Sequence, residues 1–214
     1  MNLPNLKAVC TSTAGYNHIT DTGNVLITHT PSILDKAVAD FTIALILNNL
    51  RNISGMHNHV WSGNWNINQK WDLDENLSNT IDSKILGLIG LGEIGREVVR
   101  RLAPWGLKMI YSSRTRNHSF ERDHPNLGYR ETTDAVFSEA DILSLHVPLT
   151  EETEKLVNEN LLKCMKKGAL LVNTSRGEVV DFDALINLLK HSEIDINLSL
   201  DVYDPEPVTE QMLQ

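Results

Sequence analysis

A glycine-rich stretch carries the strongest chemical signal in the chain. The apolar run 85–89 leads into Gly90-Leu91-Gly92-Glu93-Ile94-Gly95 and then into a helical pattern. Between a strand and a helix, such glycines permit a tight turn, let the backbone approach a pyrophosphate, and let helix and strand pack closely. The helix N-terminus then directs N–H groups at the phosphates. The residues predicted to bind a dinucleotide are Gly90, Gly92, Glu93, Ile94 and Gly95; the alternative is a tight turn without a ligand.

The end of the next apolar run bears on the choice of cofactor. It reads Ser112-Ser113-Arg114-Thr115-Arg116, and the first carboxylate after it is Glu121. A carboxylate at this place binds the ribose 2′-hydroxyl of NAD, whereas serine and arginine favour a 2′-phosphate. The pattern favours NADP(H) over NAD(H). The predicted ligands are Ser113, Arg114, Thr115 and Arg116; the alternative is that both arginines are solvated loop charges.

Strands and helices that could position these residues alternate after residue 83. Apolar runs predict strands at 85–89, 108–112, 141–147, 169–174 and 198–202. Helical patterns predict helices at 94–102, 133–139, 158–165 and 181–190. This alternation predicts an α/β fold with a doubly wound, mainly parallel sheet, a Rossmann-like dinucleotide-binding domain. The polar residues 116–130 break the rhythm and are predicted to form a surface connection.

The first 83 residues are less regular. Short apolar runs predict strands at 6–11 and 24–27, and apolar spacing predicts a helix from Ser32 to about Arg51. Ser32 is the expected N-cap, with Asp35 three residues on as in a capping box. Residues 55–83 contain three tryptophans and six asparagines and are predicted to form an irregular arm. The arm packs on a second subunit or folds back on its own domain.

Composition excludes several classes of protein. The chain has 214 residues, 41% of them hydrophobic, which is inconsistent with a disordered chain. Its apolar runs are far shorter than the ~20 residues of a membrane span, and its opening residues predict no secretory signal. A net charge of −9 argues against nucleic-acid and membrane partners. Cys10 and Cys164 are predicted to be buried and reduced, as in a cytoplasmic protein, and no metal site is expected.

Four motifs now define a family resemblance. They are Gly87–Gly95, Lys167–Asp181, Leu200–Pro207, and Thr30-Pro31 followed by Ala37–Asp40, where the family usually has glutamate at Asp40. Together they resemble the D-isomer-specific 2-hydroxyacid dehydrogenases over nearly the whole chain. The segments 111–116 and 61–65 look most like the glyoxylate/hydroxypyruvate reductase branch. The resemblance implies hydride transfer between a nicotinamide cofactor and a small 2-oxo or 2-hydroxy acid.

The resemblance also implies roles for individual residues. Arg176 would bind the substrate, because a guanidinium fork matches a planar carboxylate. Glu206 would be the carboxylate that raises the pKa of a catalytic histidine. Thr174, Pro148 and Asp201 would line the cofactor site. The backbone N–H groups of Ala14 and Gly15 would hold the substrate carboxylate.

The chain departs from the family pattern at both ends. Residues 1–30 are expected to be a remnant of a flavodoxin-like substrate domain, and 31–214 a dinucleotide-binding domain without its last strand and C-terminal helix. The family's catalytic histidine, in a Pro-His-x-Gly context, has no counterpart in the sequence. We expect a fragment of a longer dehydrogenase, inactive by itself and dimeric through the 55–83 arm. The alternative is a shortened relative that binds nucleotide as a binding or sensor module without turnover.

Overall fold

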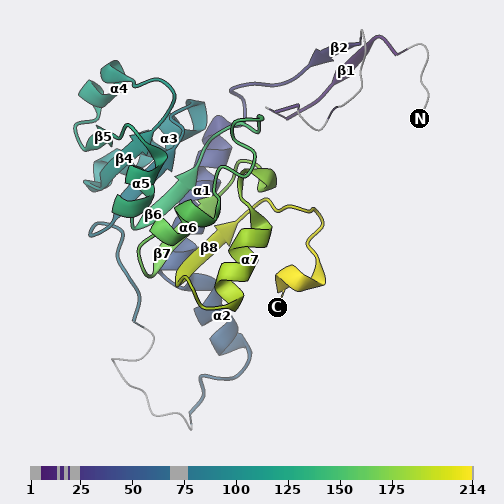
Figure 1. Ribbon diagram of the computed structural model, residues 1–214. Coiled ribbons are helices and arrows are strands. Elements are labelled where there is room, and N and C mark those ends of the chain that lie inside the picture. The colour runs from purple at the N-terminus through teal and green to yellow at the C-terminus, as the bar shows by residue number, and fades with distance from the viewer. Residues whose placement is uncertain (1–5, 14, 17–18, 20–24, 68–76, 214) are drawn as a thin grey trace.

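The computed structural model describes residues 6–13, 15, 16, 19, 25–67 and 77–213, and its centre is a six-stranded parallel sheet (Figure 1). The order of the strands is β5-β4-β3-β6-β7-β8, which is the order of the doubly wound dinucleotide-binding fold. Their bounds are β3 Ile85–Ile89, β4 Lys108–Ser112, β5 Leu127–Tyr129, β6 Ile142–Leu145, β7 Ala169–Asn173 and β8 Ile196–Leu200. The predicted α/β class and parallel sheet are confirmed.

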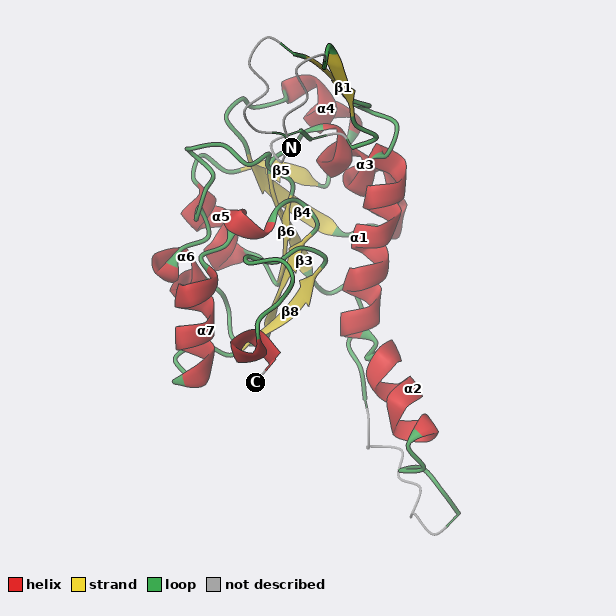
Figure 2. Cartoon of the chain, turned by 90° about the vertical axis from the view of Figure 1, so that its right-hand side faces the viewer, coloured by secondary structure: helices red, strands yellow, loops and turns green. Residues whose placement is uncertain are grey.

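Helices cover both faces of this sheet (Figure 2). One face carries α1 (Asp35–Leu50), α3 (Glu93–Leu102) and the short η1 (Ala103–Trp105). The other carries α5 (Thr133–Glu139), α6 (Glu159–Cys164) and α7 (Phe182–Lys190). The helix α4 (His118–Asp123) lies beside β5, and η2 (Gly177–Val179) and η3 (Glu210–Leu213) are single turns. Each face has its own apolar core, as expected for a sheet enclosed between two helical layers.

The burial of the strands explains the uninterrupted apolar runs in the second half of the sequence. Every residue of β6 and β7 is buried, so both strands are continuous apolar runs apart from Ser144 and Asn173. The side chains of N-cap residues fix the first turns of α6, α5 and α7. Asn158, Thr132 and Asp181 each accept a hydrogen bond from the backbone N–H three residues on.

A separate two-stranded parallel unit precedes the main domain. It consists of β1 (Ala8–Cys10) and β2 (Leu26–Thr28), and it projects from the body of the molecule (Figure 1). Both predicted strands exist but are shorter than expected. Ala14 and residues 20–24 lie outside the described residues. The proposed domain division at residue 30 stays a prediction.

The start of the first helix differs from the prediction. Helix α1 begins at Asp35 with Leu34 as its N-cap, and Ser32 has a φ of 66° and caps nothing. The turn at 31–34 places Ser32 too early to reach the first N–H groups of the helix. The buried residues of α1 are Asp35, Ala39, Thr42 and Ile46, whereas Leu34 and Phe41 are exposed. The apolar period therefore predicted the helix but not its buried face.

Two segments predicted to be irregular contain regular structure. Residues 116–130 form α4 and β5, because Phe120 and Leu127 are buried against the sheet. The expected arm begins with helix α2 (Ile53–Trp61), which has no buried residue. Trp71, and the rest of 68–76, lie outside the described residues.

The prediction that both cysteines are buried is wrong. Cys10 and Cys164 are both exposed. Cys10 lies on the projecting two-stranded unit, where no second layer covers it. Cys164 ends α6, whose buried residues are Leu161 and Leu162.

Gly177 is a point of close backbone approach and gives a test of the fold. A Cβ atom at Gly177 would lie 1.8 Å from the carbonyl oxygen of Tyr203, so Gly177→Ala forces the two backbone segments apart. We expect the free energy of unfolding to fall by about 1–3 kcal/mol or more. The control is Gly92→Ala, because a Cβ atom there meets nothing within 4 Å. Urea unfolding that gives both variants the same stability would contradict this account.

Candidate functional site

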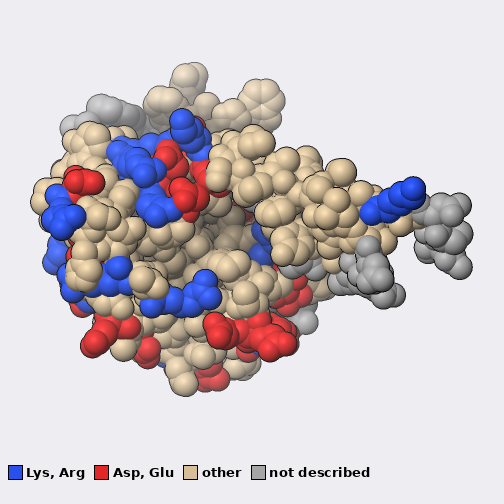
Figure 3. Space-filling view, turned by 90° about the horizontal axis from the view of Figure 1, so that it is seen from above, with Lys and Arg blue, Asp and Glu red and all other residues tan. Residues whose placement is uncertain are grey.

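The candidate site lies where β3, β4, β6 and β7 end. Parallel strands gather their carboxyl ends at one edge of the sheet, and ligands bind where the strand order reverses, here between β3 and β6. Two adjoining cavities of about 490 and 410 Å³ occupy this edge. They share His146, Val147 and Pro148. From above, the surface is hollowed beside the projecting N-terminal unit, and mainly uncharged atoms line the hollow (Figure 3).

The glycine-rich turn forms one wall of the smaller cavity, which we call the glycine-turn cavity. The turn joins β3 to α3, and the N–H of Gly90 donates to the carbonyl oxygen of Ser112 at 2.9 Å. Gly90 has a φ of +93°, and a Cβ atom there would lie 2.4 Å from the carbonyl oxygen of His146. Gly95 packs its Cα against the carbonyl of Gly90. Both positions therefore require glycine for steric reasons.

Gly92 leaves space that a phosphate could fill. It lines the glycine-turn cavity, and a Cβ atom added there would meet no atom within 4 Å. As the N-cap of α3 it has no side chain to cap the first N–H groups, which are the groups that bind anions at helix N-termini. The side chain of Glu93 instead pairs with Arg96, and Ile94 lines the larger cavity. The turn therefore fits a dinucleotide pyrophosphate.

The loop after β4 separates its two arginines. Ser113, Arg114 and Thr115 line the glycine-turn cavity. Arg116 is not among its lining residues, and its Nη2 atom lies 2.8 Å from Oε2 of Glu121. The structure thus brings three of the four predicted 2′-phosphate ligands together.

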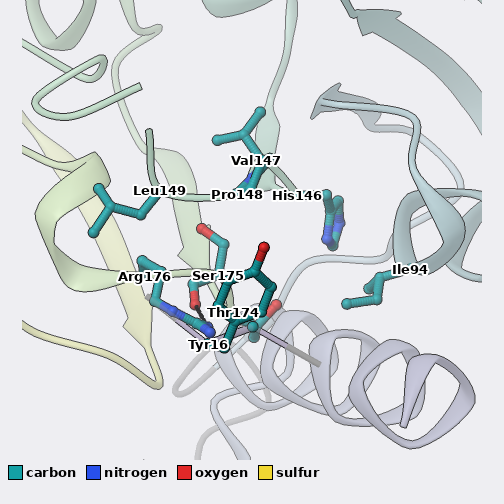
Figure 4. A pocket seen from close by; sticks show the side chains of 10 residues that line it. Tyr16, Ile94, His146, Val147, Pro148, Leu149, Thr174, Ser175 and Arg176 are labelled. Atoms are coloured by element: carbon teal, nitrogen blue, oxygen red, sulfur yellow. Dashed lines mark hydrogen bonds between the residues drawn. The ribbon is translucent and has the colours of Figure 1, made fainter. Parts of the chain in front are cut away.

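The larger cavity, which we call the Arg176 cavity, is lined by residues of both the main domain and the N-terminal segment (Figure 4). Arg176 enters it from the loop after β7, and its Nη1 donates to the carbonyl oxygen of Ser175 at 2.7 Å. Of the sequence-predicted residues, Gly15, Ile94, Pro148 and Thr174 also line this cavity. Ala14 lies outside the described residues. Tyr16 adds an aromatic wall that the sequence analysis did not single out.

Asn173 holds the loop that presents Arg176, and the sequence analysis missed it. This buried side chain donates from Nδ2 to the carbonyl oxygen of Arg176 at 2.8 Å. Its Oδ1 accepts from the backbone N–H and the hydroxyl of Ser175, at 3.0 and 2.8 Å. Buried polar groups are retained where they are fully hydrogen-bonded. A lone asparagine at the end of an apolar run was the available signal.

Asp201 and Glu206 lie beside the Arg176 loop rather than in either cavity. The N–H of Asp201 donates to the carbonyl oxygen of Asn173 at 3.0 Å. Glu206 is exposed, and its Oε1 accepts from the N–H of Tyr203 at 2.8 Å. Neither side chain is among the described residues that line the two cavities.

His146 occupies the wall between the two cavities. Its Nε2 lies 2.9 Å from the hydroxyl of Ser144, which is fully buried. Burial lowers the pKa of His146 to about 4, because desolvation penalises the imidazolium. The side chain is therefore neutral at pH 7.

The fold and the site together define a dinucleotide-binding α/β domain with an arginine-bearing cavity beside the nucleotide turn. Residues 43–214 match the family described as "D-isomer specific 2-hydroxyacid dehydrogenase, NAD binding domain". The chain belongs to this family.

Similar proteins agree with this assignment. A glyoxylate reductase of Thermofilum pendens is 39% identical over 96% of this chain, and one of Thermococcus litoralis is 38% identical over 96%. The chain spans 60% and 63% of the lengths of these relatives. Among solved structures, an NADPH-dependent glyoxylate/hydroxypyruvate reductase from Sinorhizobium meliloti in complex with NADP and malonate has a TM-score of 0.84 and 30% identity. That alignment covers 98% of this chain and 64% of the other.

No helix in the described part of the chain is long and apolar enough to cross a membrane.

His146 makes a testable contribution to the pH dependence of stability. Its folded pKa of about 4 is below its unfolded value of about 6.5, so the unfolded state binds the proton more tightly. The free energy of unfolding should be fully maintained above about pH 6.5 and fall as the pH approaches 4. The slope from this group is at most about 1.4 kcal/mol per pH unit. Urea unfolding between these pH values measures it.

The variant His146→Gln should reduce that slope, and the matched control is His191→Gln, a substitution of an exposed histidine at the end of α7. Carboxylates that titrate in the same range contribute equally to all three proteins and cancel in the difference. Equal slopes in wild type and His146→Gln would show that His146 titrates normally in the folded protein.

Proposed function

We propose that this chain is the cofactor-binding and substrate-binding core of an NADP(H)-dependent reductase of glyoxylate or hydroxypyruvate. One observation carries the proposal: a cavity with Arg114 and a cavity with Arg176 share the wall His146–Pro148. A nucleotide bound along the glycine turn would thus end beside a site for a small anionic substrate. The proposal places the enzyme in the cytoplasm.

The proposed preference for NADP(H) rests on the end of β4. Residues 112–116 contain no carboxylate to repel a 2′-phosphate, and Arg114 is exposed at the rim of the glycine-turn cavity. The proposed cofactor ligands are Gly90, Gly92, Glu93, Ile94, Gly95, Ser113, Arg114, Thr115, Pro148, Thr174 and Asp201; Arg116 pairs with Glu121 instead. The Sinorhizobium meliloti reductase, whose crystal structure contains NADP, supports the proposed preference for NADP(H).

The proposed reaction reduces the carbonyl group of a 2-oxo acid. A nicotinamide cofactor held by the glycine turn would supply the hydride for the carbonyl carbon, and the carbonyl oxygen would take up a proton. Arg176 would hold the carboxylate, together with the N–H groups of Ala14 and Gly15. Because the pKa of His146 is about 4, its imidazole is neutral at pH 7 and is not the acid that supplies this proton. We propose that Glu206 orients the family's catalytic histidine and raises the pKa of that histidine, as the family resemblance implies.

We also propose that two copies of the chain associate through the arm 55–83 and the adjoining exposed helices. Helix α2 buries none of its residues. Large apolar side chains are exposed on α1, on α2 and on the segment after it: Phe41, Ile53, Val60, Trp61, Trp65, Ile67 and Leu77. Exposed apolar patches of this kind mark association surfaces.

The dimer proposal predicts that Trp61→Glu yields a monomer in sedimentation velocity. Trp61 is 83% exposed, so the substitution leaves the monomer's core intact while it places a charge in the interface. The matched control is Trp105→Glu, at a position that is 47% exposed on η1 and outside the arm. A wild-type monomer, or a Trp61→Glu dimer, would refute the proposal.

The cofactor and substrate assignments predict that two variants weaken the binding of different ligands. Arg114→Asp should weaken NADPH binding by about 10- to 100-fold, because it replaces a charged phosphate ligand with a carboxylate, and should shift the preference towards NADH. Arg176→Ala should leave NADPH binding unchanged and weaken glyoxylate binding to the NADPH complex by about 100-fold. Isothermal titration measures both. Each variant is the control for the other.

Turnover is measured on the polypeptide as the cell makes it, by NADPH oxidation with glyoxylate and with hydroxypyruvate. Arg176→Ala should abolish it. Activity retained in that variant would refute the substrate assignment, and an unchanged NADPH-to-NADH ratio in Arg114→Asp would refute the cofactor assignment.

A further inference from the structure

The loop that ends β4 is tied to the segment α4–β5 by one compact polar cluster. The hydroxyl of Tyr111, a fully buried residue of β4, donates to Oε1 of Glu121 at 2.8 Å. The same hydroxyl accepts from the N–H of Asn117 at 2.8 Å. Arg116 donates from Nε and Nη2 to the two oxygens of Glu121, at 3.0 and 2.8 Å. The turn 112–117 therefore begins on the strand of Tyr111, and at its other end it is hydrogen-bonded to the Tyr111 hydroxyl.

The cluster stands on a packed base. Phe120 and Leu127 are buried in the core on the α1–α3 side of the sheet and anchor α4 and β5 there. Asn117 caps α4 by accepting from the N–H of Phe120 at 3.1 Å. The guanidinium of Arg116 lies over the ring of Tyr129 on β5, 5.3 Å from its centroid. The position of Arg116 is thus set from two directions.

The geometry determines what Arg116 can offer a ligand. Its fork of Nε and Nη2 faces Glu121, and its ring-facing side is covered by Tyr129. The carboxylate of Glu121 is largely buried, with 13% of the side chain exposed, and Arg116 is its cationic partner. Hydrogen bonds from Arg116 hold the pKa of Glu121 below its usual range, so the pair stays ionised. Arg114, in contrast, lines the glycine-turn cavity.

We propose that Tyr111, Arg116 and Glu121 form a lock that holds the turn Ser113–Thr115 in the conformation that receives a 2′-phosphate, and that Arg116 positions this turn instead of binding the phosphate. The inference rests on the proposed NADP(H) function. The turn is short, and Ser113 further stiffens it by donating to the carbonyl oxygen of Thr115 at 2.7 Å. A pre-organised turn spares the ordering cost on binding, which increases affinity.

The sign of one effect separates the lock from a direct contact. Glu121→Gln removes a negative charge near the turn and frees the fork of Arg116. If Arg116 bound the phosphate, this change would tighten NADPH binding. If the lock holds the turn, Glu121→Gln and Arg116→Gln should each weaken NADPH binding by about tenfold and leave NADH binding within about twofold.

The experiment measures dissociation constants of NADPH and NADH by isothermal titration for the 214-residue chain. The variants are Glu121→Gln, Arg116→Gln, their double variant, Tyr111→Phe and Arg114→Gln. The lock predicts that the double variant is no weaker than either single one, because both remove the same interaction. The lock also predicts that Tyr111→Phe lowers the affinity for NADPH, by a smaller factor than Glu121→Gln or Arg116→Gln.

The matched control is Glu139→Gln, because Glu139 forms a comparable two-bond pair with Arg130 outside the glycine-turn cavity. Its ratio of NADPH to NADH affinity should equal that of the wild type. Thermal unfolding of each variant separates a loss of folding from a loss of discrimination, since a general loss of folding lowers both affinities.

Three results would overturn the lock. Tighter NADPH binding in Glu121→Gln, or additive losses in the double variant, would assign Arg116 to the phosphate. An effect of Arg114→Gln without effects of Glu121→Gln and Arg116→Gln would show that the turn needs no lock. If Arg114→Gln also leaves the NADPH-to-NADH ratio unchanged, the proposed cofactor preference falls as well, which distinguishes the two failures.

Discussion

The pairing of β3 with β4 on one side and with β6 on the other determines where the residues of the glycine-turn cavity lie. All three strands run in parallel, so the loops after Ile89, Ser112 and Leu145 leave from the same edge of the sheet. The connections separate at this place, because β3 leads to α3 on one face and β6 leads to α6 on the other. The close contact between Gly90 and the carbonyl of His146 is the direct result of this pairing. It leaves no room for a side chain at that end of β3.

Polar side chains are buried at the ends of these strands, and their hydrogen bonds shape the site. An unpaired polar group in this position would cost roughly 1–3 kcal/mol, so each one fixes the loop that satisfies it. Asn173 fixes the loop of Arg176. Thr174 meets Thr42 of α1 at 3.0 Å and connects that loop to the opposite helical layer. The strand ends are thus hydrogen-bonded to the loops that follow them and, through Thr42, to α1.

The sequence predicted the parts of the fold that depend on local patterns. Uninterrupted apolar runs such as β7 can be recognised because both of their faces are buried, and the glycine-rich turn because its glycines are sterically required. Strand β5 was missed because only Leu127 of its three residues is fully buried. The partners of Arg116 depend on how α4 folds back on β4, which no local pattern contains. Two arginines two positions apart therefore seemed equivalent in the sequence, although they have different surroundings in the structure.

The two cavities are built from different parts of the chain, so their properties are largely separable. The described residues that line the glycine-turn cavity all fall between Ile89 and Leu156, within the sheet domain. The Arg176 cavity also needs Gly15 and Tyr16 from the N-terminal segment. A substitution at the end of β4 can thus change the glycine-turn cavity without changing the lining of the Arg176 cavity. The two cavities share the wall 146–148, and His146 is held there by Ser144 on β6 and by the glycine turn.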